Sequence, residues 1–502
     1  DDSLGAIRVA GMQFATDGYR IEGDAIELIS GVNSVRVGDG AALGAGSIAT
    51  IASELTGAGA LAKTDLGTLV LTGANTYAGG TTITAGILQL GDGVTAGSIV
   101  GPVINNDTLL FNNPTATILT GNISGAGEVD QIGAGATTLT GTSSYTGWTG
   151  VYAGELRVAG GGRVNGTANV TVDTGSLMVT DSGSSFTTPG DLMIGRGTGD
   201  VTVTVANGAE LTTSRTFLGE TGMTTSATAL IATVTGPGSV WSSTNGFFLG
   251  AESGAAPASL TVSNGGVMRS LDVTSIIGRG GSATVTVTDA NSQLVLDGTA
   301  PLFLGGELAG GDGTLTIANG ALAIAPEVLM GVGGASGTLN INGTAGARGA
   351  LQTISLVKSV GSGTVNLDGG VVRASADSDT FISDFDPGNI MIGAGGAFID
   401  SNGFTVTASS ALAGAGLLTK QGNGTLILTA ANHYTGGTTI TSGTLQLGDG
   451  GAVGSITGDV TDNGTLAFDR SDDVTFTGLI GGTGAVNQNG PGTTILTGDN
   501  SY

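Results

Sequence analysis

The sequence predicts an all-β protein built as a β-solenoid of about 20 coils, at about 24 residues per coil. Three observations lead to this prediction. Short runs of alternating Val, Ile, Leu and Thr recur along the 502 residues, and glycine, which supplies 95 residues, closes most of these runs. The chain also repeats itself at intervals of roughly 20–30 residues, which is typical of solenoids, whereas propeller blades need about 40–45 residues.

The individual strands are predicted by alternation. Residues 201–205 read Val-Thr-Val-Thr-Val and are followed by Asn207-Gly208, and residues 283–288 show the same pattern. Alternation of this kind buries Val on one face and leaves Thr on the solvated face. Gly, Asn and Asp supply the positive φ that tight turns require. We therefore expect three short parallel strands per coil and almost no helix.

A strong repeat flanks the centre of the chain. Residues 55–145 match residues 412–502 at a constant offset of 357, and residues 55–93 and 412–450 are identical at 27 of 39 positions. We expect alternating leucines of the two copies to stack as one buried face. They are Leu69, Leu71, Leu88 and Leu90 in the first copy and Leu426, Leu428, Leu445 and Leu447 in the second.

A weaker copy begins 68 residues after each strong one. The first weak copy starts at Ile123, and the second starts at Ile480 and stops at Tyr502, halfway through the unit. The chain opens on Asp1-Asp2-Ser3 and not on Met. We therefore expect a processed or excised fragment whose natural chain continues.

The central part of the chain contains a different repeat, an apolar pair followed by Gly, with glycine spacings of 24 to 31 residues. The copies are Met193-Ile194-Gly195, Phe217-Leu218-Gly219, Phe248-Leu249-Gly250, Ile276-Ile277-Gly278, Phe303-Leu304-Gly305 and Leu329-Met330-Gly331. Lys358-Ser359 interrupts the next expected copy, and we expect the pattern to return at Met391-Ile392-Gly393.

Composition excludes several classes of protein. Lys plus Arg is 15 and Asp plus Glu is 40, so the formal charge is −25, with one His and no Cys. No disulfide framework or cysteine-based metal site can form. Nucleic acids and anionic membrane surfaces are poor partners because both attract clustered Lys and Arg. No stretch reaches the ~20 apolar residues of a membrane helix. Any charge-driven partner should be basic.

The strong copies share a fixed series of residues: a Lys, a Gly-Thr-Leu-x-Leu strand, Asn-x-Tyr-x-Gly-Gly-Thr-Thr and a Gly-x-Leu-Gln-Leu strand. The series is Lys63 with residues 67–71, 75–82 and 86–90, and Lys420 with residues 424–428, 432–439 and 443–447. It resembles the passenger-associated transport repeat of Gram-negative autotransporters, which use type V secretion. The weak copies have Gln131 and Gln488 in place of Lys, and Trp148 in place of one Gly.

Two further segments carry the resemblance. The central units resemble the autotransporter-associated Gly-rich repeat, and residues 11–14 and 18–21 are similar to segments that precede such repeats. The resemblance implies a right-handed parallel β-helix passenger, displayed at the bacterial cell surface or secreted across the outer membrane, with transport repeats that aid secretion. It also implies a C-terminal outer-membrane β-barrel as export partner, and residues 1–502 contain no antiparallel ten-residue lipid-facing strands ending in an aromatic.

The repeats suggest four segments within one continuous solenoid. We expect an N-terminal β-helix segment at residues 1–54, a first transport-repeat pair at 55–160, central Gly-rich repeats at 161–411, and a second, truncated pair at 412–502.

The candidate catalytic groups are few. His433 is the single histidine, and the other three repeat copies have Thr76, Ser144 and Ser501 at its position. A position that accepts these residues does not require an imidazole, so we expect no Ser-His-Asp triad.

Two groups of carboxylates allow more than one interpretation. They are Asp377, Asp379, Asp384 and Asp386, and the pair Asp472-Asp473. Solvated turns are the favoured interpretation, and weak calcium binding or acid–base catalysis are the alternatives. Trp148 and Trp241 suit core or corner packing better than exposed binding. We expect no catalytic, cofactor-binding or metal-binding residue and no cofactor.

These inferences favour a non-enzymatic passenger that acts as an adhesin or self-associating virulence factor. Its expected partners are a host cell surface, an extracellular matrix protein, or further copies on neighbouring cells. The alternatives are a β-helix enzyme that acts on polysaccharide and a passive stalk that presents another domain.

Overall fold

The computed structural model describes residues 6–219, 229–252, 254, 256–271, 273–308 and 310–502, so Asp1, Asp2 and Ser3 lie outside the described residues. The described chain is a succession of short strands with two 3-10 helices, η1 (Ala42–Gly46) and η2 (Val332–Gly334). No helix in this part of the chain is long and apolar enough to cross a membrane. The prediction of an all-β protein with almost no helix is confirmed.

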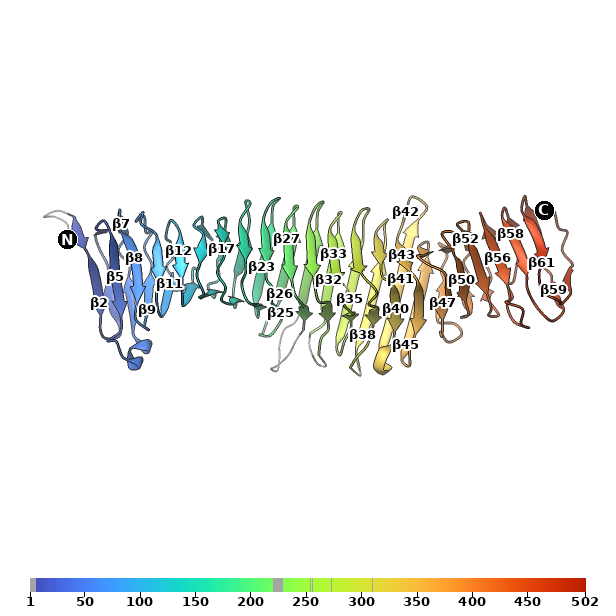
Figure 1. Cartoon of the computed structure of the whole chain (residues 1–502), viewed down its shortest axis with the longest axis horizontal. Helices are drawn as coiled ribbons and strands as arrows, with labels where there is room; N and C mark the ends of the chain where they lie inside the picture. The colour runs from blue at the N-terminus through green and yellow to red at the C-terminus, as the bar shows by residue number, and fades with distance from the viewer. Residues whose placement is uncertain (1–5, 220–228, 253, 255, 272, 309) are drawn as a thin grey trace. The chain divides into compact units, whose positions relative to one another are not determined.

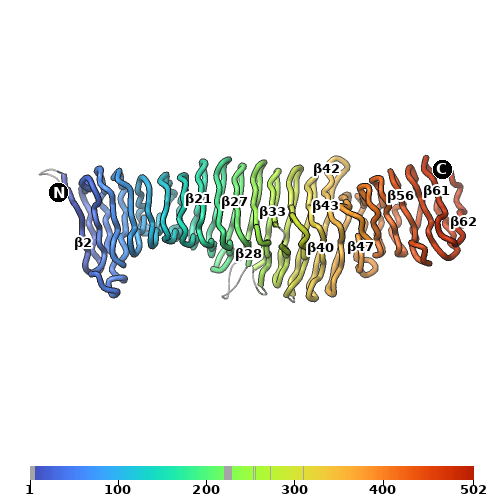
Figure 2. Tube along the Cα trace, viewed as in Figure 1, coloured from blue at the N-terminus to red at the C-terminus, as the bar shows by residue number. Residues whose placement is uncertain are grey.

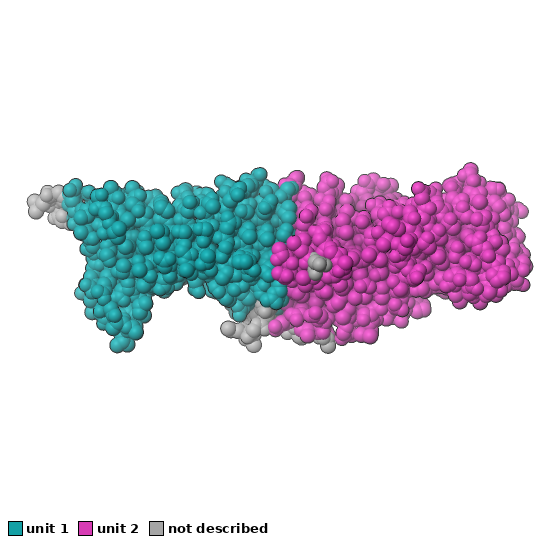
Figure 3. Space-filling view, in the orientation of Figure 1, with its two compact units in different colours: residues 1–233, 238–242 teal, residues 234–237, 243–502 magenta. Residues whose placement is uncertain are grey.

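The chain divides into two compact units, which Figure 3 colours separately. Unit 1 comprises residues 1–233 and 238–242, and unit 2 comprises residues 234–237 and 243–502. Within each unit the strands stack coil on coil, and nearly all described pairings are parallel (Figures 1 and 2). The predicted β-solenoid of about 20 stacked coils is therefore confirmed.

Many coils contribute one strand to each of three faces, whereas coils such as that of β9 (Thr68–Leu71) and β10 (Thr81–Ile83) contain two strands. In unit 1 one coil consists of β16 (Glu128–Gln131), β17 (Ala136–Leu139) and β18 (Thr142–Ser143), and the next of β19 (Thr149–Val151), β20 (Glu155–Val158) and β21 (Arg163–Asn165). Each strand pairs in parallel with its counterpart in the next coil. Backbone donors and acceptors are thereby satisfied between residues about 20 positions apart.

Each unit has a face, here called face 1, to which its successive described coils contribute one strand each. In unit 1 it contains β3 (Tyr19–Ile21), β6 (Ile48–Ile51), β9 (Thr68–Leu71), β11 (Ile87–Leu90), β13 (Thr108–Phe111), β16, β19, β22 (Val170–Val172), β25 (Leu192–Ile194) and β28 (Thr216–Leu218). In unit 2 it contains β31 (Phe247–Leu249), β34 (Ser275–Ile277), β37 (Leu302–Leu304), β40 (Glu327–Met330), β44 (Ser355–Lys358), β47 (Ser378–Ser383), β50 (Thr405–Ala408), β53 (Thr425–Leu428), β56 (Thr444–Leu447), β58 (Thr465–Phe468) and β61 (Ala485–Gln488).

A second face of unit 2, here called face 2, begins with strands of six to nine residues and ends with strands of two or three. They are β32 (Ala258–Ser263), β35 (Ser282–Val287), β38 (Asp312–Ile317), β41 (Ser336–Thr344), β45 (Ser362–Asp368), β48 (Ile390–Ile392), β51 (Leu412–Gly414) and β54 (His433–Tyr434). The antiparallel strand β42 (Ala347–Arg348) folds back on the end of β41 and projects from the stack in Figure 1.

The core is a ladder of side chains that point inward at alternate positions. Leu69 and Leu71 of β9 pair with Leu88 and Leu90 of β11, and all four are at most 2% exposed. The equivalent leucines of β53 and β56 are packed in the same way. Side-chain direction alternates along a strand, so one register buries a continuous apolar column. The predicted buried leucine face is confirmed.

The apolar-pair-Gly repeat has a simple structural cause. In Phe248-Leu249-Gly250 the second residue is buried in the core (1% exposed), whereas Phe248 points to the outer side of face 1. The glycine then turns the chain: Gly305, one coil on from Gly278, has φ +70°. A Cβ at Gly305 would lie 1.9 Å from the carbonyl oxygen of Ser336, so this position requires glycine.

The continuation of this repeat differs from the prediction. Val357 and Lys358 of β44 occupy the positions that pair with Leu329 and Met330, so the copy continues there with Lys in the inward position. Met391 lies instead on β48 of face 2. Spacing alone could not detect this change, because a longer turn moves the same three-residue pattern to another face.

Candidate functional site

A buried lysine lies at the start of the first strong transport repeat. The Lys63 side chain is 0% exposed, and its Nζ donates hydrogen bonds to the carbonyl oxygens of Asp65 (2.6 Å), Ala85 (2.8 Å) and Thr64 (3.3 Å). Ala85 belongs to the following coil, so the ammonium ties two coils together. Burial lowers the pKa of Lys63 to about 8, although the Asp107 carboxylate opposes this shift.

The second strong repeat builds the same arrangement. Nζ of Lys420, also 0% exposed, donates to the carbonyl oxygens of Gly422 (2.7 Å), Gln421 (2.9 Å) and Ser442 (3.2 Å). Burial lowers the pKa of Lys420 to about 8, and the Asp400 carboxylate raises it in part. The lysine that marks the motif in the sequence therefore satisfies backbone acceptors inside the coil.

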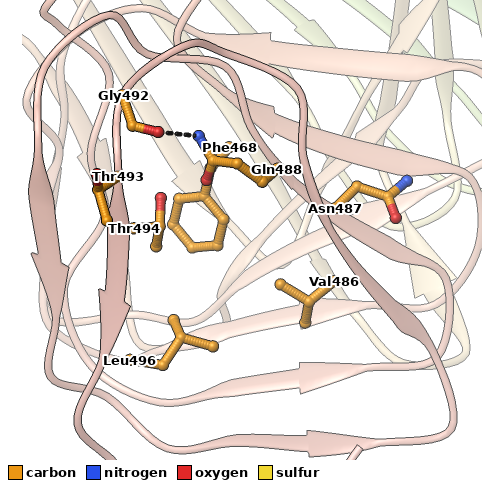
Figure 4. Close-up of a pocket in the computed structure, with 8 residues that line it drawn as sticks. All are labelled: Phe468, Val486, Asn487, Gln488, Gly492, Thr493, Thr494 and Leu496. Atoms are coloured by element: carbon orange, nitrogen blue, oxygen red, sulfur yellow. Dashed lines mark hydrogen bonds between the residues drawn. The ribbon is translucent and has the colours of Figure 1, made fainter.

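The weak repeats perform this task with an amide. Nε2 of Gln131 donates to the carbonyl oxygens of Gly133 (2.7 Å) and Gly135 (2.9 Å). Nε2 of Gln488 donates to the Gly492 carbonyl at 2.8 Å, the contact drawn as a dashed line in Figure 4. The loss of Lys in the weak copies is therefore a replacement of one backbone-binding donor by another.

A buried tyrosine forms the second constant contact of the repeats. The hydroxyl groups of Tyr77 and Thr81 lie 2.6 Å apart, and those of Tyr434 and Thr438 lie 2.7 Å apart. Both tyrosines are 0% exposed, and burial raises their pKa. Each ring fills the corner of its coil while the hydroxyl finds a partner, as buried phenols require.

The asparagine before this tyrosine caps the corner. Oδ1 of Asn75 accepts a hydrogen bond from the Leu55 amide at 2.9 Å, and its Nδ2 donates to the carbonyl oxygens of Gly73 and Ser98, both at 2.9 Å. Asn432 makes the equivalent three contacts. The polar residues of the motif thus bind the backbone of their own and adjacent coils, which makes the transport repeat a structural module.

His433 lies on β54, where it is exposed between the buried side chains of Asn432 and Tyr434. Its backbone pairs with Ala413 of the previous coil. The imidazole therefore points away from the core, at the position that holds Thr76 in the first repeat.

The four clustered aspartates are exposed, and Asp379 lies within strand β47 and not in a turn. Oδ1 of Asp377 accepts a hydrogen bond from the Thr405 amide at 2.7 Å. Asp384 adopts φ 65°, and Asp386 lies 3.5 Å from the Lys358 ammonium.

The aspartate pair near the C-terminus is also engaged. Asp472 forms two hydrogen bonds with the Arg470 guanidinium, at 2.8 and 3.0 Å, which lower the pKa of its carboxyl group. Oδ1 of Asp473 accepts from the Thr493 amide at 2.9 Å. Across the described ranges of the chain, no group of three or more His, Asp or Glu side chains is arranged to hold a metal ion.

The outer surface of face 2 carries a regular array of polar side chains, here called the polar grid. Three rows of outward residues run across β35, β38, β41 and β45 in exact register. The rows are Ser282, Asp312, Ser336 and Ser362; Thr284, Thr314, Thr338 and Thr364; and Thr286, Thr316, Asn340 and Asn366. Neighbouring strands are about 4.8 Å apart, so the grid offers hydroxyl and amide groups at a fixed repeat.

Hydrogen bonds along the stack hold part of the grid in place. Nδ2 of Asn340 donates to Oγ1 of Thr316 at 3.2 Å, and Nδ2 of Asn366 donates to Oδ1 of Asn340 at 2.8 Å. Eleven of the twelve grid residues are uncharged, Asp312 being the exception. Sequence reasoning found the Thr-rich alternation, but only the register brings these residues into rows.

The two tryptophans differ in environment. Trp241 is 1% exposed, in agreement with the prediction of core packing, whereas Trp148 is 42% exposed on face 1. The expectation of core or corner packing is therefore wrong for Trp148. In this repeat Trp148 replaces a glycine, and the additional ring stands outside the coil.

One hollow of about 350 Å³ lies inside the last coil (Figure 4). It lies among Phe468 of β58, Val486 and Gln488 of β61, and Leu496 of β62 (Thr494–Leu496). Its eight lining residues include no titratable side chain. Asn487, Gln488 and Thr493 of this lining are exposed, so the hollow is open to solvent, and it offers no group for acid–base chemistry.

The geometry thus defines a repeat-built β-solenoid whose motif residues bind its own backbone. Residues 61–90, 130–158, 418–447 and 486–502 match the passenger-associated-transport-repeat family, at the four copies found in the sequence. The chain is 33% identical to the adhesin BmaC autotransporter of Brucella suis biovar 1 (strain 1330) over 615 residues. This alignment covers all of the chain, which spans 16% of the length of that relative.

The chain belongs to the autotransporter passenger domains. Such domains are carried to the bacterial cell surface or secreted across the outer membrane. The localisation predicted from the repeat motif is confirmed at this level.

Proposed function

We propose that this passenger is a non-enzymatic adhesin that binds a host cell surface, a matrix protein or further copies on neighbouring cells. The observation that carries the proposal is the polar grid, because it offers many equivalent contact groups on a rigid backbone. The curated relative is named an adhesin, which supports the same function. The engaged aspartates and the solvated position of His433 favour binding over catalysis.

Within this proposal the segments have different roles. Residues 55–160 and 412–502 act as transport-repeat modules that stabilise the passenger during export. Residues 161–411 supply the adhesive surface, and residues 1–54 form the N-terminal β-helix segment. Because each exposed polar contact contributes about 1 kcal/mol or less, adhesion is spread over many coils.

The test is binding of the purified chain to host cells, to a panel of matrix proteins and to itself. A quadruple variant would replace Thr314, Thr338, Asn340 and Asn366 with Lys. Its matched control would carry four Lys substitutions at Ser34, Thr56, Ser124 and Ser176, which are partly or fully exposed in unit 1. Loss of binding in the grid variant alone supports the proposal. Binding that survives in the grid variant contradicts the role of the grid.

The enzyme and stalk alternatives give different results. Turnover of any member of a polysaccharide panel, abolished by His433→Ala or by Asp384→Asn with Asp386→Asn, would establish an enzyme. Absence of binding to every surface would support the passive stalk.

A further inference from the structure

Two exposed aromatic rings flank one short strand of face 1 in unit 1. Trp148, Gly150 and Tyr152 point outward, because they alternate with the fully buried Thr149 and Val151. Trp148 and Tyr152 are each 42% exposed. Gly150 lies between the two rings in the sequence and is itself buried, because the Tyr152 ring lies over it.

A carboxylate lies at the centre of this surface. Asp130 pairs with Gly150 across β16 and β19. A Cβ on Gly150 would lie 2.3 Å from Cε2 of Tyr152 and 2.5 Å from Oδ1 of Asp130. The tyrosine ring and the carboxylate therefore meet above the glycine, and this close arrangement needs a residue without a side chain.

The other transport repeats serve as an internal control. Where this copy has Asp130, Trp148 and Tyr152, the first strong repeat has Ala62, Gly80 and Thr84. The second strong repeat has Thr419, Gly437 and Thr441. All three copies build the same coil, so the coil does not require the carboxylate or either ring. A feature that the fold does not require, and that places a carboxylate between exposed aromatic rings, points to a ligand.

The charge around Asp130 is uncompensated. Burial, and then the Glu128 carboxylate, raise the pKa of Asp130 to about 6. Burial, and then the Asp130 and Asp173 carboxylates, raise the pKa of Tyr152, whereas the Arg196 guanidinium lowers it. In the described part of the chain, no Lys or Arg forms an ion pair with Asp130, Glu128 or Asp173. A partly desolvated carboxylate gains when a cation approaches it.

We propose that Trp148, Tyr152 and Asp130 form a receptor for a Lys or Arg side chain of a basic partner protein. The cation would lie against the aromatic rings, which attract it through their quadrupoles, and would neutralise Asp130. This inference deepens the proposed adhesin function and rests on it for its biological setting. The net charge of −25 favours a basic partner over heparin, nucleic acid or an anionic membrane.

The probe is a fluorescently labelled hexalysine peptide, titrated onto the full chain at low ionic strength. Trp148→Gly and Tyr152→Thr install the residues of the other repeats, and Asp130→Asn removes the charge. Asp379→Asn is the control, because it removes one exposed charge from unit 2. Thermal unfolding of each variant verifies that the coil is intact.

We expect Trp148→Gly and Asp130→Asn each to weaken hexalysine binding about tenfold or more, and Asp379→Asn less than about twofold. Binding by the unmodified chain should weaken below about pH 6, as Asp130 takes up a proton. Equal effects of Asp130→Asn and Asp379→Asn would show general charge attraction and overturn the proposal. Binding of neutral oligosaccharides that depends on Trp148, without hexalysine binding, would also overturn it.

Cell binding by the same variants separates this inference from the adhesin proposal. Hexalysine binding that depends on Trp148, in a chain that binds no cells, would uphold the receptor and contradict the adhesin function. Cell binding by a chain that does not bind hexalysine would give the opposite conclusion.

Discussion

Lys63 and Gln131 occupy equivalent positions in successive transport repeats, and both end on backbone carbonyl oxygens of the turn that follows. The ammonium reaches three acceptors, one of them in the next coil, whereas the amide reaches two in its own turn. Both side chains supply donors to carbonyl groups of the turn, one of which, Gly135, also accepts from the Glu155 amide. This position of the motif therefore needs a side chain that carries hydrogen-bond donors and is long enough to reach the carbonyl groups of the turn.

This relationship predicts the outcome of substitutions at Lys420. Lys420→Met keeps the apolar stem but leaves the carbonyl groups of Gly422 and Ser442 without this donor, which should cost about 1–3 kcal/mol. The Gln421 carbonyl retains its hydrogen bond from the Ser401 amide. Lys420→Gln should cost less, because Gln131 and Gln488 work in the weak copies. Local stability can be measured by hydrogen exchange of residues 418–447. Equal losses in the two variants would contradict the shared role of the two side chains.

Lys63 and Lys420 also predict a pH dependence. Burial lowers both pKa values from 10.5 to about 8, so the unfolded chain binds more protons than the folded chain between these values. The free energy of unfolding should therefore rise as the pH increases from about 8 to 10.5. Chemical denaturation across this range measures the slope. The Lys63→Gln, Lys420→Gln double variant should lose this rise. If the variant shows the same slope as the parent chain, the two lysines are not the cause of the pH dependence.

Leu428 tests the apolar column. It is 0% exposed and pairs with Leu447 in the next coil. Leu428→Ala should destabilise its coils by about 2–5 kcal/mol, because the cavity cannot close between fixed strands. We expect faster proteolysis near residue 428 and lower surface display in the producing cells. Ile427→Ala is the matched control, since this side chain points outward from the same strand. The hypothesis fails if both variants resist protease as well as the parent chain.

Asp130 predicts a local conflict between binding and stability. Its pKa of about 6 in the folded chain exceeds the value of 3.8 without the surrounding structure. The folded state then binds the proton of Asp130 more strongly than the unfolded state. The contribution of Asp130 to the free energy of unfolding is therefore greatest below about pH 4 and is lost as the pH rises to about 6. Asp130→Asn should remove this fall and be more stable than the parent at pH 7. Thermal unfolding at pH 4 and pH 7 would reveal the difference, and a less stable variant at pH 7 would refute the argument.

His433 should be dispensable. The side chain is exposed, and three repeat copies fold without a histidine at this position. His433→Ala should change the free energy of unfolding by no more than about 0.5 kcal/mol and leave cell binding unchanged. Urea denaturation and a cell-binding assay suffice. A large loss of binding with intact folding would assign His433 to a binding or catalytic site.

The sequence by itself determined the solenoid, the alternation that buries Leu69 and Leu71, and the four transport repeats. These features are local or periodic: side-chain direction alternates residue by residue, and each repeat displays its own turn chemistry. For the same reason the sequence could show that His433 occupies a replaceable position. The sequence also showed the polar motif residues, Lys63 among them, as a repeated pattern. It did not show that their side chains form hydrogen bonds with the backbone.

Tertiary structure alone decided which residues meet between coils. Asp130, Gly150 and Tyr152 come together because β16 and β19 pair in one register, and a shift by one residue would send each side chain to the opposite face. The same dependence places Met391 on face 2 and exposes Trp148 while Trp241 is buried. Turn lengths set this register, and their effect on the stacking of residues some 20 positions apart cannot be deduced from alternation within a strand.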